Sequence, residues 1–249
     1  MIRLHLRKTA QNVPLLSAHE INGLAERILS DYCGEVLRKP QPLNIENLLE
    51  KYLQLQMDYQ YLSNDGHILG MTVFNDTNKV IIFLPEYQKA EYLHADRGTI
   101  IIDNNLLDPR QERRYRFTIG HECAHWILHN DYYAYNPDQL SLLDNSEPFV
   151  QCREINGCDL QANKRAWSQT RWLEWQADKL SAALLMPETI LRRWVGNHPF
   201  SSFLDAHSCI KNLAAVFNVS EQAAFLRLHD LNLIRTPGTK SEYSQLSFL

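Results

Sequence analysis

Cysteine is sparse in this sequence and is not arranged as a metal-binding or disulfide framework. The chain has 249 residues and five cysteines, an odd number, and it contains no C-x-x-C motif. The closest pair is Cys152 and Cys158, and neither residue has a partner at a spacing typical of zinc ribbons. We therefore expect free thiols, and this cysteine usage favours a reducing cytoplasm.

Long apolar runs and a strong charge of one sign are also missing. No run approaches the roughly 18 apolar residues of a membrane span. The segment from Met1 to Leu16 has basic residues but no continuous apolar core, so we do not expect a signal peptide. The formal net charge of −4 predicts no overall attraction to nucleic acid or to an anionic membrane. The 45% hydrophobic and 22% charged content is typical of a globular protein that can bury a sizeable core.

The first half of the chain predicts two helices followed by strands. Ser17 and Glu20 form a capping box before an apolar stripe that ends at Gly34, and Asn44 can cap a short helix through Leu53. Alternating or β-branched residues then predict strands at 55–61, 68–74, 80–84 and 98–103. The Asn75–Asn78 turn predicts a hairpin between the second and third of these strands.

The second half of the chain is predicted to be mainly helical. Asp108 and Gln111 predict a capping box for a helix over 109–129, and residues 130–168 are expected to be irregular. Further helices are expected at 170–186, 188–195, 202–217 and 221–230. This order predicts an α+β fold with a small, mostly antiparallel sheet. We expect one main domain over 1–200, a helical subdomain over 201–235 and a tail over 236–249.

The chemistry is concentrated in one motif, H-E-x-x-H, at residues 121–125. Residues four apart lie on one face of a helix, so His121 and His125 can direct two imidazole nitrogens at one zinc ion. Glu122 lies beside them and can act as the general base that removes a proton from water. The motif predicts the core of a zinc hydrolase.

A catalytic zinc site needs a third protein ligand. His129 is an unsuitable candidate, because eight residues of helix carry it about 12 Å along the axis from His121. We expect it instead to be a packing or capping histidine near a helix C-terminus that favours a cation. We predict that Glu174 is the third ligand and that Asp178 accepts a hydrogen bond from a ligating histidine. The alternatives are one of His198, His207 or His229, with Glu174 and Asp178 on a solvated helix face.

Two blocks of the chain resemble the ImmA/IrrE family of zinc metallopeptidases. Residues 116–125 read R-F-T-I-G-H-E-C-A-H, and residues 174–187 read E-W-Q-A-D-K-L-S-A-A-L-L-M-P. Departures are Leu180-Ser181, where the family has Phe-Ala, and a longer segment between the blocks. The resemblance implies a gluzincin-like (zincin) fold, bound zinc, and cleavage of a regulatory protein such as a helix-turn-helix repressor or an antitoxin-like regulator.

The predicted activity is zinc-dependent endopeptidase cleavage of a protein substrate, with Glu122 as base and His121, His125 and Glu174 as ligands. An oxyanion donor could come from Tyr132, Tyr133, Tyr135 or His207, none of which is singled out. The strand at 99–103 could pair with an extended substrate, or it could lie inside the sheet.

Two other hypotheses compete with the peptidase. Residues 213–229 have a helix-turn-helix pattern, but Arg227 is the one basic side chain on the second helix before His229, so DNA binding is disfavoured. The arginines Arg110, Arg113, Arg114 and Arg116 are interpreted as a solvated face that could hold an acidic partner. A zinc-binding regulator that binds a partner without cleaving it would keep the same ligands.

Overall fold

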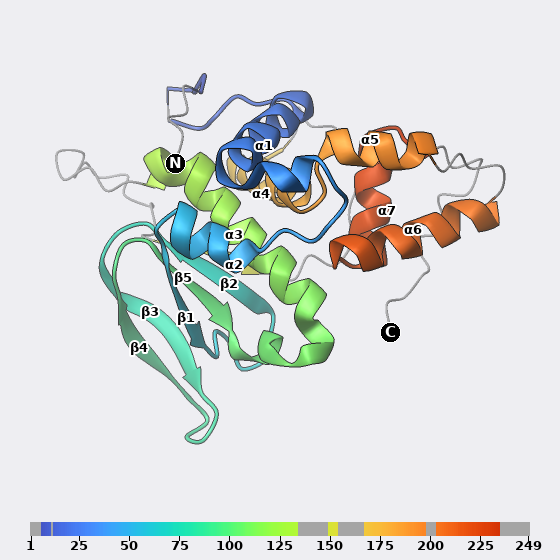
Figure 1. Ribbon diagram of the computed structural model, residues 1–249. Coiled ribbons are helices and arrows are strands. Elements are labelled where there is room, and N and C mark those ends of the chain that lie inside the picture. The colour runs from blue at the N-terminus through green and yellow to red at the C-terminus, as the bar shows by residue number, and fades with distance from the viewer. Residues whose placement is uncertain (1–5, 11, 134–148, 154–166, 198–202, 235–249) are drawn as a thin grey trace.

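The computed structural model describes residues 6–10, 12–133, 149–153, 167–197 and 203–234. Its helices are α1 Ala18–Cys33, α2 Ile45–Asn47, α3 Glu112–Tyr133, α4 Gln169–Leu185, α5 Glu188–Asn197, α6 Phe203–Phe217 and α7 Glu221–Asp230. Its strands are β1 Gln56–Gln60, β2 Ile68–Val73, β3 Thr77–Leu84, β4 Lys89–Ala95, β5 Thr99–Asp103 and β6 Phe149–Arg153. The predicted α+β class is confirmed, and Figure 1 shows the sheets on one side of α3 and most other helices on the opposite side.

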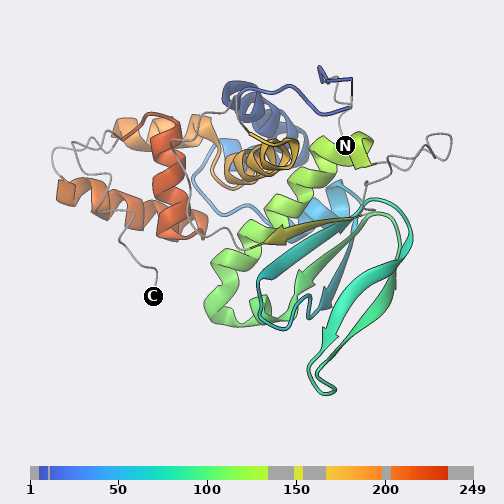
Figure 2. The same ribbon diagram turned by 180° about the vertical axis from the view of Figure 1, so that it is seen from behind.

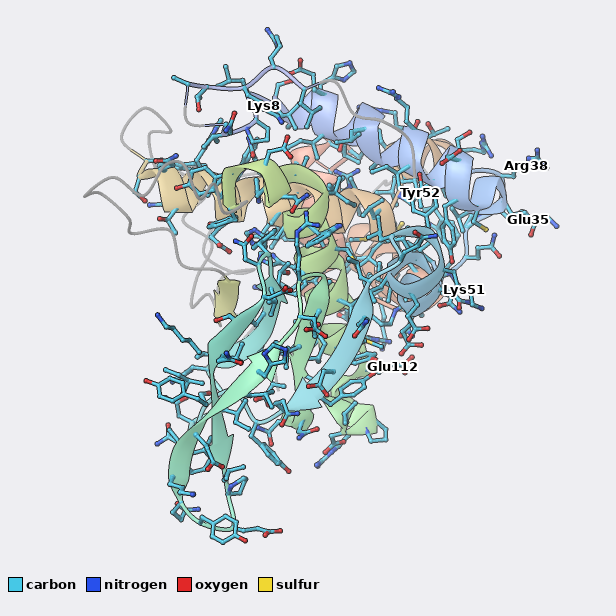
Figure 3. The ribbon with its side chains drawn as sticks, turned by 90° about the vertical axis from the view of Figure 1, so that its left-hand side faces the viewer. Lys8, Glu35, Arg38, Lys51, Tyr52 and Glu112 are labelled. Carbon is cyan, nitrogen blue, oxygen red and sulfur yellow. The ribbon has the colours of Figure 1, made fainter. Side chains whose placement is uncertain are left out.

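Helix α1 begins where the sequence predicts it. The Ser17 hydroxyl accepts a hydrogen bond from the Glu20 backbone N–H, and the Glu20 carboxylate accepts one from the Ser17 N–H. The predicted helix capped by Asn44 is also present, and it continues from α2 into a π-helical turn over Leu48–Tyr52. Exposed Glu35, Arg38 and Lys51 lie on the outer side of this helical layer (Figure 3).

The main sheet has four strands in the order β1-β5-β2-β6. Strand β5 runs parallel to β1 and antiparallel to β2, and all five of its residues are buried. Of the two alternatives for this strand, the internal position is therefore the observed one, and pairing with a substrate at an open edge is excluded. The strand's Thr-Ile-Ile-Ile centre suits a position covered on both faces.

The predicted hairpin between β2 and β3 is wrong. Strand β2 pairs with β5 and β6, whereas β3 pairs with β4 in a separate two-stranded ribbon that projects from the molecule (Figure 1). Strand β4 is almost entirely exposed, so its sequence lacks the apolar alternation by which strands are recognised. The real hairpin turn lies between Leu84 and Lys89.

Two further boundaries differ from the prediction. Helix α3 continues to Tyr133, and β6 occupies part of the segment expected to be irregular. At the start of α3, Asp108 accepts from the Arg110 N–H, and a short 3-10 turn over Pro109–Gln111 precedes the α-helix. Helix α4 is capped by Ser168, two residues before the predicted start at Thr170.

Helices α3 and α4 pack closely because small residues meet at their crossing. Ser181 lies against Gly120, and its hydroxyl donates to the Phe117 carbonyl at 3.1 Å. The small side chains at this contact allow the two helices to approach closely. Figure 2 shows α3 between the main sheet on one side and α1 and α4 on the other.

One hydrophobic core extends from Leu16 to Ile234 and includes buried residues of α1, α3, α4 and the C-terminal helices. Arg227 of α7 joins this core. It donates to the Met186 carbonyl at 3.1 Å and to Asn22 Oδ1 at 2.8 Å. Within the described residues, no helix has the length and apolarity that crossing a membrane requires.

Candidate metal centre

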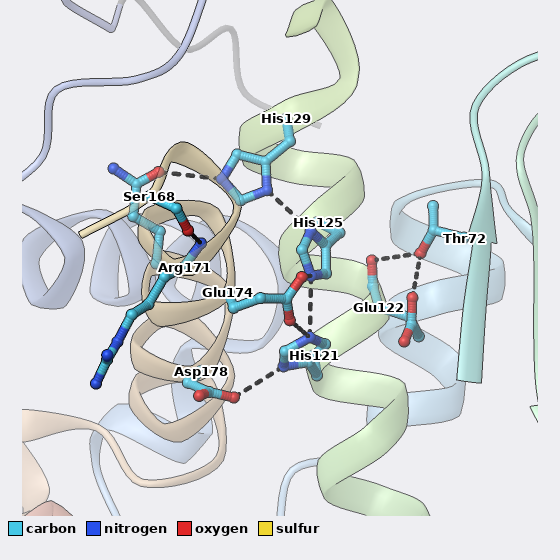
Figure 4. Close-up of polar contacts among 10 residues, drawn as sticks. Thr72, His121, Glu122, His125, His129, Ser168, Arg171, Glu174 and Asp178 are labelled. Carbon is cyan, nitrogen blue, oxygen red and sulfur yellow. Dashed lines mark hydrogen bonds and ion pairs between the residues drawn. The ribbon is translucent and has the colours of Figure 1, made fainter. Parts of the chain in front are cut away.

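Helices α3 and α4 bring together three side chains of the kinds that bind metal ions. Donor atoms of His121, His125 and Glu174 all lie within 4.8 Å of one another. The two Nε2 atoms are 2.9 Å apart, and the Glu174 oxygens lie 3.2 Å from His121 Nε2 and 3.4 Å from His125 Nε2. The three residues predicted from the sequence could therefore hold one metal ion (Figure 4).

The other ring nitrogen of each histidine has a different partner. His121 Nδ1 lies 2.9 Å from Asp178 Oδ1, as predicted from the spacing of Glu174 and Asp178. His125 Nδ1 lies 3.0 Å from His129 Nδ1. With both Nδ1 atoms engaged, the Nε2 atoms are the ones that face Glu174.

Glu122 is fully buried on the side of α3 that faces the sheet. The Thr72 hydroxyl on β2 donates to its Oε2 at 2.6 Å (Figure 4). Its Oε1 has no hydrogen-bond partner within the part of the chain that is described. Burial raises the pKa of Glu122, and the charges of His121 and His125 and the Thr72 hydrogen bond only partly offset that rise.

Gly70 leaves the space that Glu122 occupies. A Cβ atom at this position would lie 2.8 Å from Glu122 Oε1 and 2.8 Å from Thr118 Cγ2. Such contacts are too short for a side chain to be accommodated without movement. Gly70 and Thr72 are two apart on β2, so both face α3 and together they form the wall behind Glu122.

Glu174 has the opposite electrostatic behaviour. Burial alone would raise its pKa, but hydrogen bonds from His121 and His125 outweigh burial, and the pKa falls well below its usual range. Its side chain is 24% exposed. The carboxylate therefore stays ionised beside the two imidazoles, as a metal ligand must.

His129 packs behind His125, as expected, but it is not a cation at a helix end. The ring is completely buried, and α3 continues for one more turn to Tyr133. Burial lowers the pKa of His129 to about 3. Its Nε2 lies 3.0 Å from Gln176 Oε1.

The alternative third ligands do not join the cluster. His207 and His229 lie on α6 and α7, and the described residues form a three-ligand group only at His121, His125 and Glu174. His198 falls outside the residues that the structure describes, and so does Tyr135.

Two other predicted features have a structural role. Tyr132 and Tyr133 belong to α3, and Tyr133 stacks on Phe74 with ring centroids 4.7 Å apart. Arg116 is not part of a solvated face, because it donates to the Leu43 carbonyl at 2.8 Å and to the Asn218 carbonyl at 3.1 Å. Arg110, by contrast, is exposed and pairs with Asp108.

Sequence reasoning missed three residues that support the centre, namely Gly70, Thr72 and Gln176. The period-two spacing of Gly70 and Thr72 predicts that they share one face of a strand. It does not predict which helix packs against that face. Gln176 lies between Glu174 and Asp178 and was not predicted, because an amide is rarely a zinc ligand.

A scan against protein-family models finds no match for this chain, and a search of curated proteins finds none either.

Proposed function

We propose that this protein is a zinc-dependent endopeptidase of the ImmA/IrrE type with a zincin-like catalytic core. The observation that carries the proposal is the convergence of His121, His125 and Glu174 beside a buried Glu122 with one free carboxylate oxygen. Two imidazoles and one carboxylate are the ligand set of thermolysin-type zinc enzymes.

The residues fit a zinc ion by distance and by chemistry. Ligand atoms that each lie about 2.0–2.1 Å from a tetrahedral ion are roughly 3.3 Å apart. The two Nε2 atoms are 2.9 Å apart, and they lie 3.2 and 3.4 Å from the two different oxygens of Glu174, which are separations close to that value. The set also lacks a thiolate, which favours zinc over softer metals and fits a catalytic more than a structural site.

In the proposed hydrolysis, zinc activates the substrate and water, and the buried Glu122 transfers the proton. When bound, zinc supplies a Lewis acid that polarises the scissile carbonyl and lowers the pKa of water. Glu122 takes a proton from the attacking water at its free Oε1 and delivers it to the leaving amine. Thr72 keeps the other carboxylate oxygen, Oε2, occupied, whereas Oε1 lies against Gly70 and accepts no hydrogen bond from the described residues.

The substrate class comes from the resemblance of residues 116–125 and 174–187 to the ImmA/IrrE motifs. It is a protein, with helix-turn-helix repressors and similar regulators as the first candidates. A DNA-binding role is disfavoured by Arg227, because this arginine of α7 is only 2% exposed.

The test compares wild type with Glu122→Gln and Glu174→Ala. We expect one zinc per chain in wild type and Glu122→Gln, and loss of zinc in Glu174→Ala. A partner trapped on Glu122→Gln and identified by mass spectrometry should be cleaved by wild type about 10² to 10⁴ times faster than by Glu122→Gln. Glu112→Gln, at an exposed position on the same helix, is the control and should cleave normally.

A zinc-loaded wild type that binds the trapped partner but leaves it intact would refute the peptidase. That result would favour a zinc-binding regulator that binds without cleavage. Full zinc occupancy in Glu174→Ala would refute the ligand assignment itself.

A further inference from the structure

A chain of hydrogen bonds extends from His125 to the N-terminal segment. Gln176 Nε2 donates to the Pro14 carbonyl at 2.7 Å. Gln176 Oε1 lies 3.0 Å from His129 Nε2, and His129 Nδ1 lies 3.0 Å from His125 Nδ1. His129 and Gln176 are each completely buried, so no solvent competes for these contacts. We call this chain, from Pro14 through Gln176 and His129 to His125, the Gln176 relay.

The direction of each hydrogen bond follows from its outer end. A proline carbonyl can only accept, so the atom facing Pro14 must be the amide nitrogen of Gln176. The amide oxygen therefore faces His129 and must accept a hydrogen from His129 Nε2. The orientation of the Gln176 amide therefore follows from which of its partners can donate and which can accept a hydrogen bond.

The inner end follows from the metal centre. An imidazole that binds a metal through Nε2 carries its hydrogen on Nδ1. The hydrogen between the two Nδ1 atoms therefore belongs to His125, and His129 accepts it with a lone pair. Both ends of the relay require the same form of His129, a neutral ring with its hydrogen on Nε2.

We propose that His129 and Gln176 are positioning residues that select the metal-binding tautomer of His125 and raise the affinity of the site for zinc. The inference rests on the proposed zinc site but not on peptide hydrolysis. His121 has a carboxylate, Asp178, behind it, whereas His125 has a neutral imidazole oriented by an amide. The two ligands are thus held by chemically different supports.

The relay also connects the centre to the N-terminal segment around Pro14. Pro14 is buried, and its segment is closed by backbone hydrogen bonds from Thr9 to Val13 and from Leu15 to Arg7, each 2.8 Å long. These bonds hold the Pro14 carbonyl in a fixed place. The acceptor at the outer end of the relay is therefore a backbone carbonyl, whose position does not depend on a side-chain rotamer.

The test measures zinc affinity by competition with a chromophoric chelator. His129→Leu removes the acceptor for His125 Nδ1 and should weaken zinc binding about 10- to 100-fold. His129→Asn supplies an amide oxygen near the position of Nδ1 and should restore most of the affinity. Gln176→Met frees His129 to adopt either tautomer and should give an intermediate loss. Leu128→Ala, one residue away in the core, controls for lost packing and should leave zinc affinity unchanged.

A folded His129→Leu protein that binds zinc as tightly as wild type would overturn the proposal. So would equal losses in His129→Leu, His129→Asn and Leu128→Ala, because that pattern indicates packing alone. A wild type that binds no zinc would instead overturn the proposed function.

Nitrogen-15 NMR of zinc-loaded wild type gives a readout that needs no variant. We expect His129 as the neutral Nε2–H tautomer, with a scalar coupling across the hydrogen bond between the two Nδ1 atoms. A His129 protonated on Nδ1 would contradict the relay.

Discussion

Glu122 and Glu174 are carboxylates near the same pair of histidines, yet their surroundings move their pKa values in opposite directions. Burial raises the pKa of Glu122, whereas hydrogen bonds from the histidines lower that of Glu174 despite burial. A divergence of this kind separates acid–base groups from permanently ionised ones. At the scale of single residues, this divergence supports the proposed division, in which Glu122 transfers a proton and Glu174 binds the metal.

Thr72 should affect catalysis without affecting the metal. Thr72→Val keeps the side-chain shape but removes the donor to Glu122 Oε2, a bond to an ionised group worth about 1.5–3 kcal/mol. We expect kcat/KM to fall about 10-fold or more while zinc content stays at one per chain. Steady-state kinetics and metal analysis of the same preparation check both statements.

Thr72→Ser retains the hydroxyl and is the matched control. It should recover most of the activity that Thr72→Val loses. Equal activity in Thr72→Val and wild type would show that Glu122 needs no support from β2.

Single residues differ in how well they could be predicted. His121, Glu122 and His125 follow from spacing on one helix, and Glu174 and Asp178 follow from spacing on another. Thr72 and Gly70 could not be predicted, because their role depends on which helix crosses β2. That crossing is tertiary information that no local pattern contains.

Helix α1 shows how an element begins for reasons that can be read locally, and it predicts a pH dependence. Hydrogen bonds from the Ser17 backbone and side chain lower the pKa of Glu20 to about 2 from its ordinary 4.5. The ionised Glu20 therefore stabilises the fold above about pH 4.5, and this contribution is lost as the pH falls from 4.5 towards 2.

We expect Glu20→Gln to be less stable than wild type at pH 7 and the two to become similar near pH 2. Denaturant unfolding of both zinc-free proteins measures the difference. Ser17→Ala, which removes the N-cap, should cost about 1 kcal/mol at pH 7. A gap between Glu20→Gln and wild type that widens at low pH would contradict the assignment.

The crossing of α3 and α4 is the element-scale feature on which the metal centre depends. A Cβ added at Gly120 would lie 2.5 Å from Ser181 Oγ and 3.5 Å from Ser181 Cβ. Gly120→Ala should therefore destabilise the zinc-free protein by about 1–3 kcal/mol through overpacking. Gly120→Ala combined with Ser181→Ala should recover part of this loss, because only the Oγ contact is too short.

Gly23→Ala on α1 is the control for glycine replacement in a helix. No atom lies within 4 Å of the added Cβ there, so this change should stabilise the protein by about 0.5–1 kcal/mol. Thermal unfolding of Gly120→Ala, Ser181→Ala, the double variant and Gly23→Ala distinguishes crowding from helix propensity. Non-additivity between Gly120→Ala and Ser181→Ala is the expected signature of direct contact.

Elements with strong local signals were predicted, and pairings between elements were not. The capping box and apolar stripe of α1 can be read from its own sequence. Strand β2 pairs with segments more than 25 residues away along the chain. The turn-forming residues Asn75–Asn78 instead predict a hairpin with β3, which the structure does not have. Strand β4 pairs with β3, and most of its residues are exposed, so it has little apolar content that could reveal it.

On the scale of the whole molecule, α3 joins two parts of the structure. One face carries Glu122 towards the sheet, and the other carries His121 and His125 towards α4 (Figure 4). The helices on the far side share one core with it from α1 to Ile234. A metal ion at the centre would therefore connect α3 to α4 within this core.

This arrangement predicts that zinc stabilises the entire fold. Glu174 belongs to α4 and the histidines belong to α3, so separating the helices during unfolding destroys the site. Binding to the folded state alone adds about 2.7 kcal/mol when free zinc is 100 times the dissociation constant. We expect the unfolding temperature of wild type and Glu122→Gln to rise equally with zinc, because Glu122 is not a ligand. Glu174→Ala should unfold at a temperature that is nearly independent of zinc, and a zinc-dependent rise matching that of wild type would show that α4 supplies no ligand.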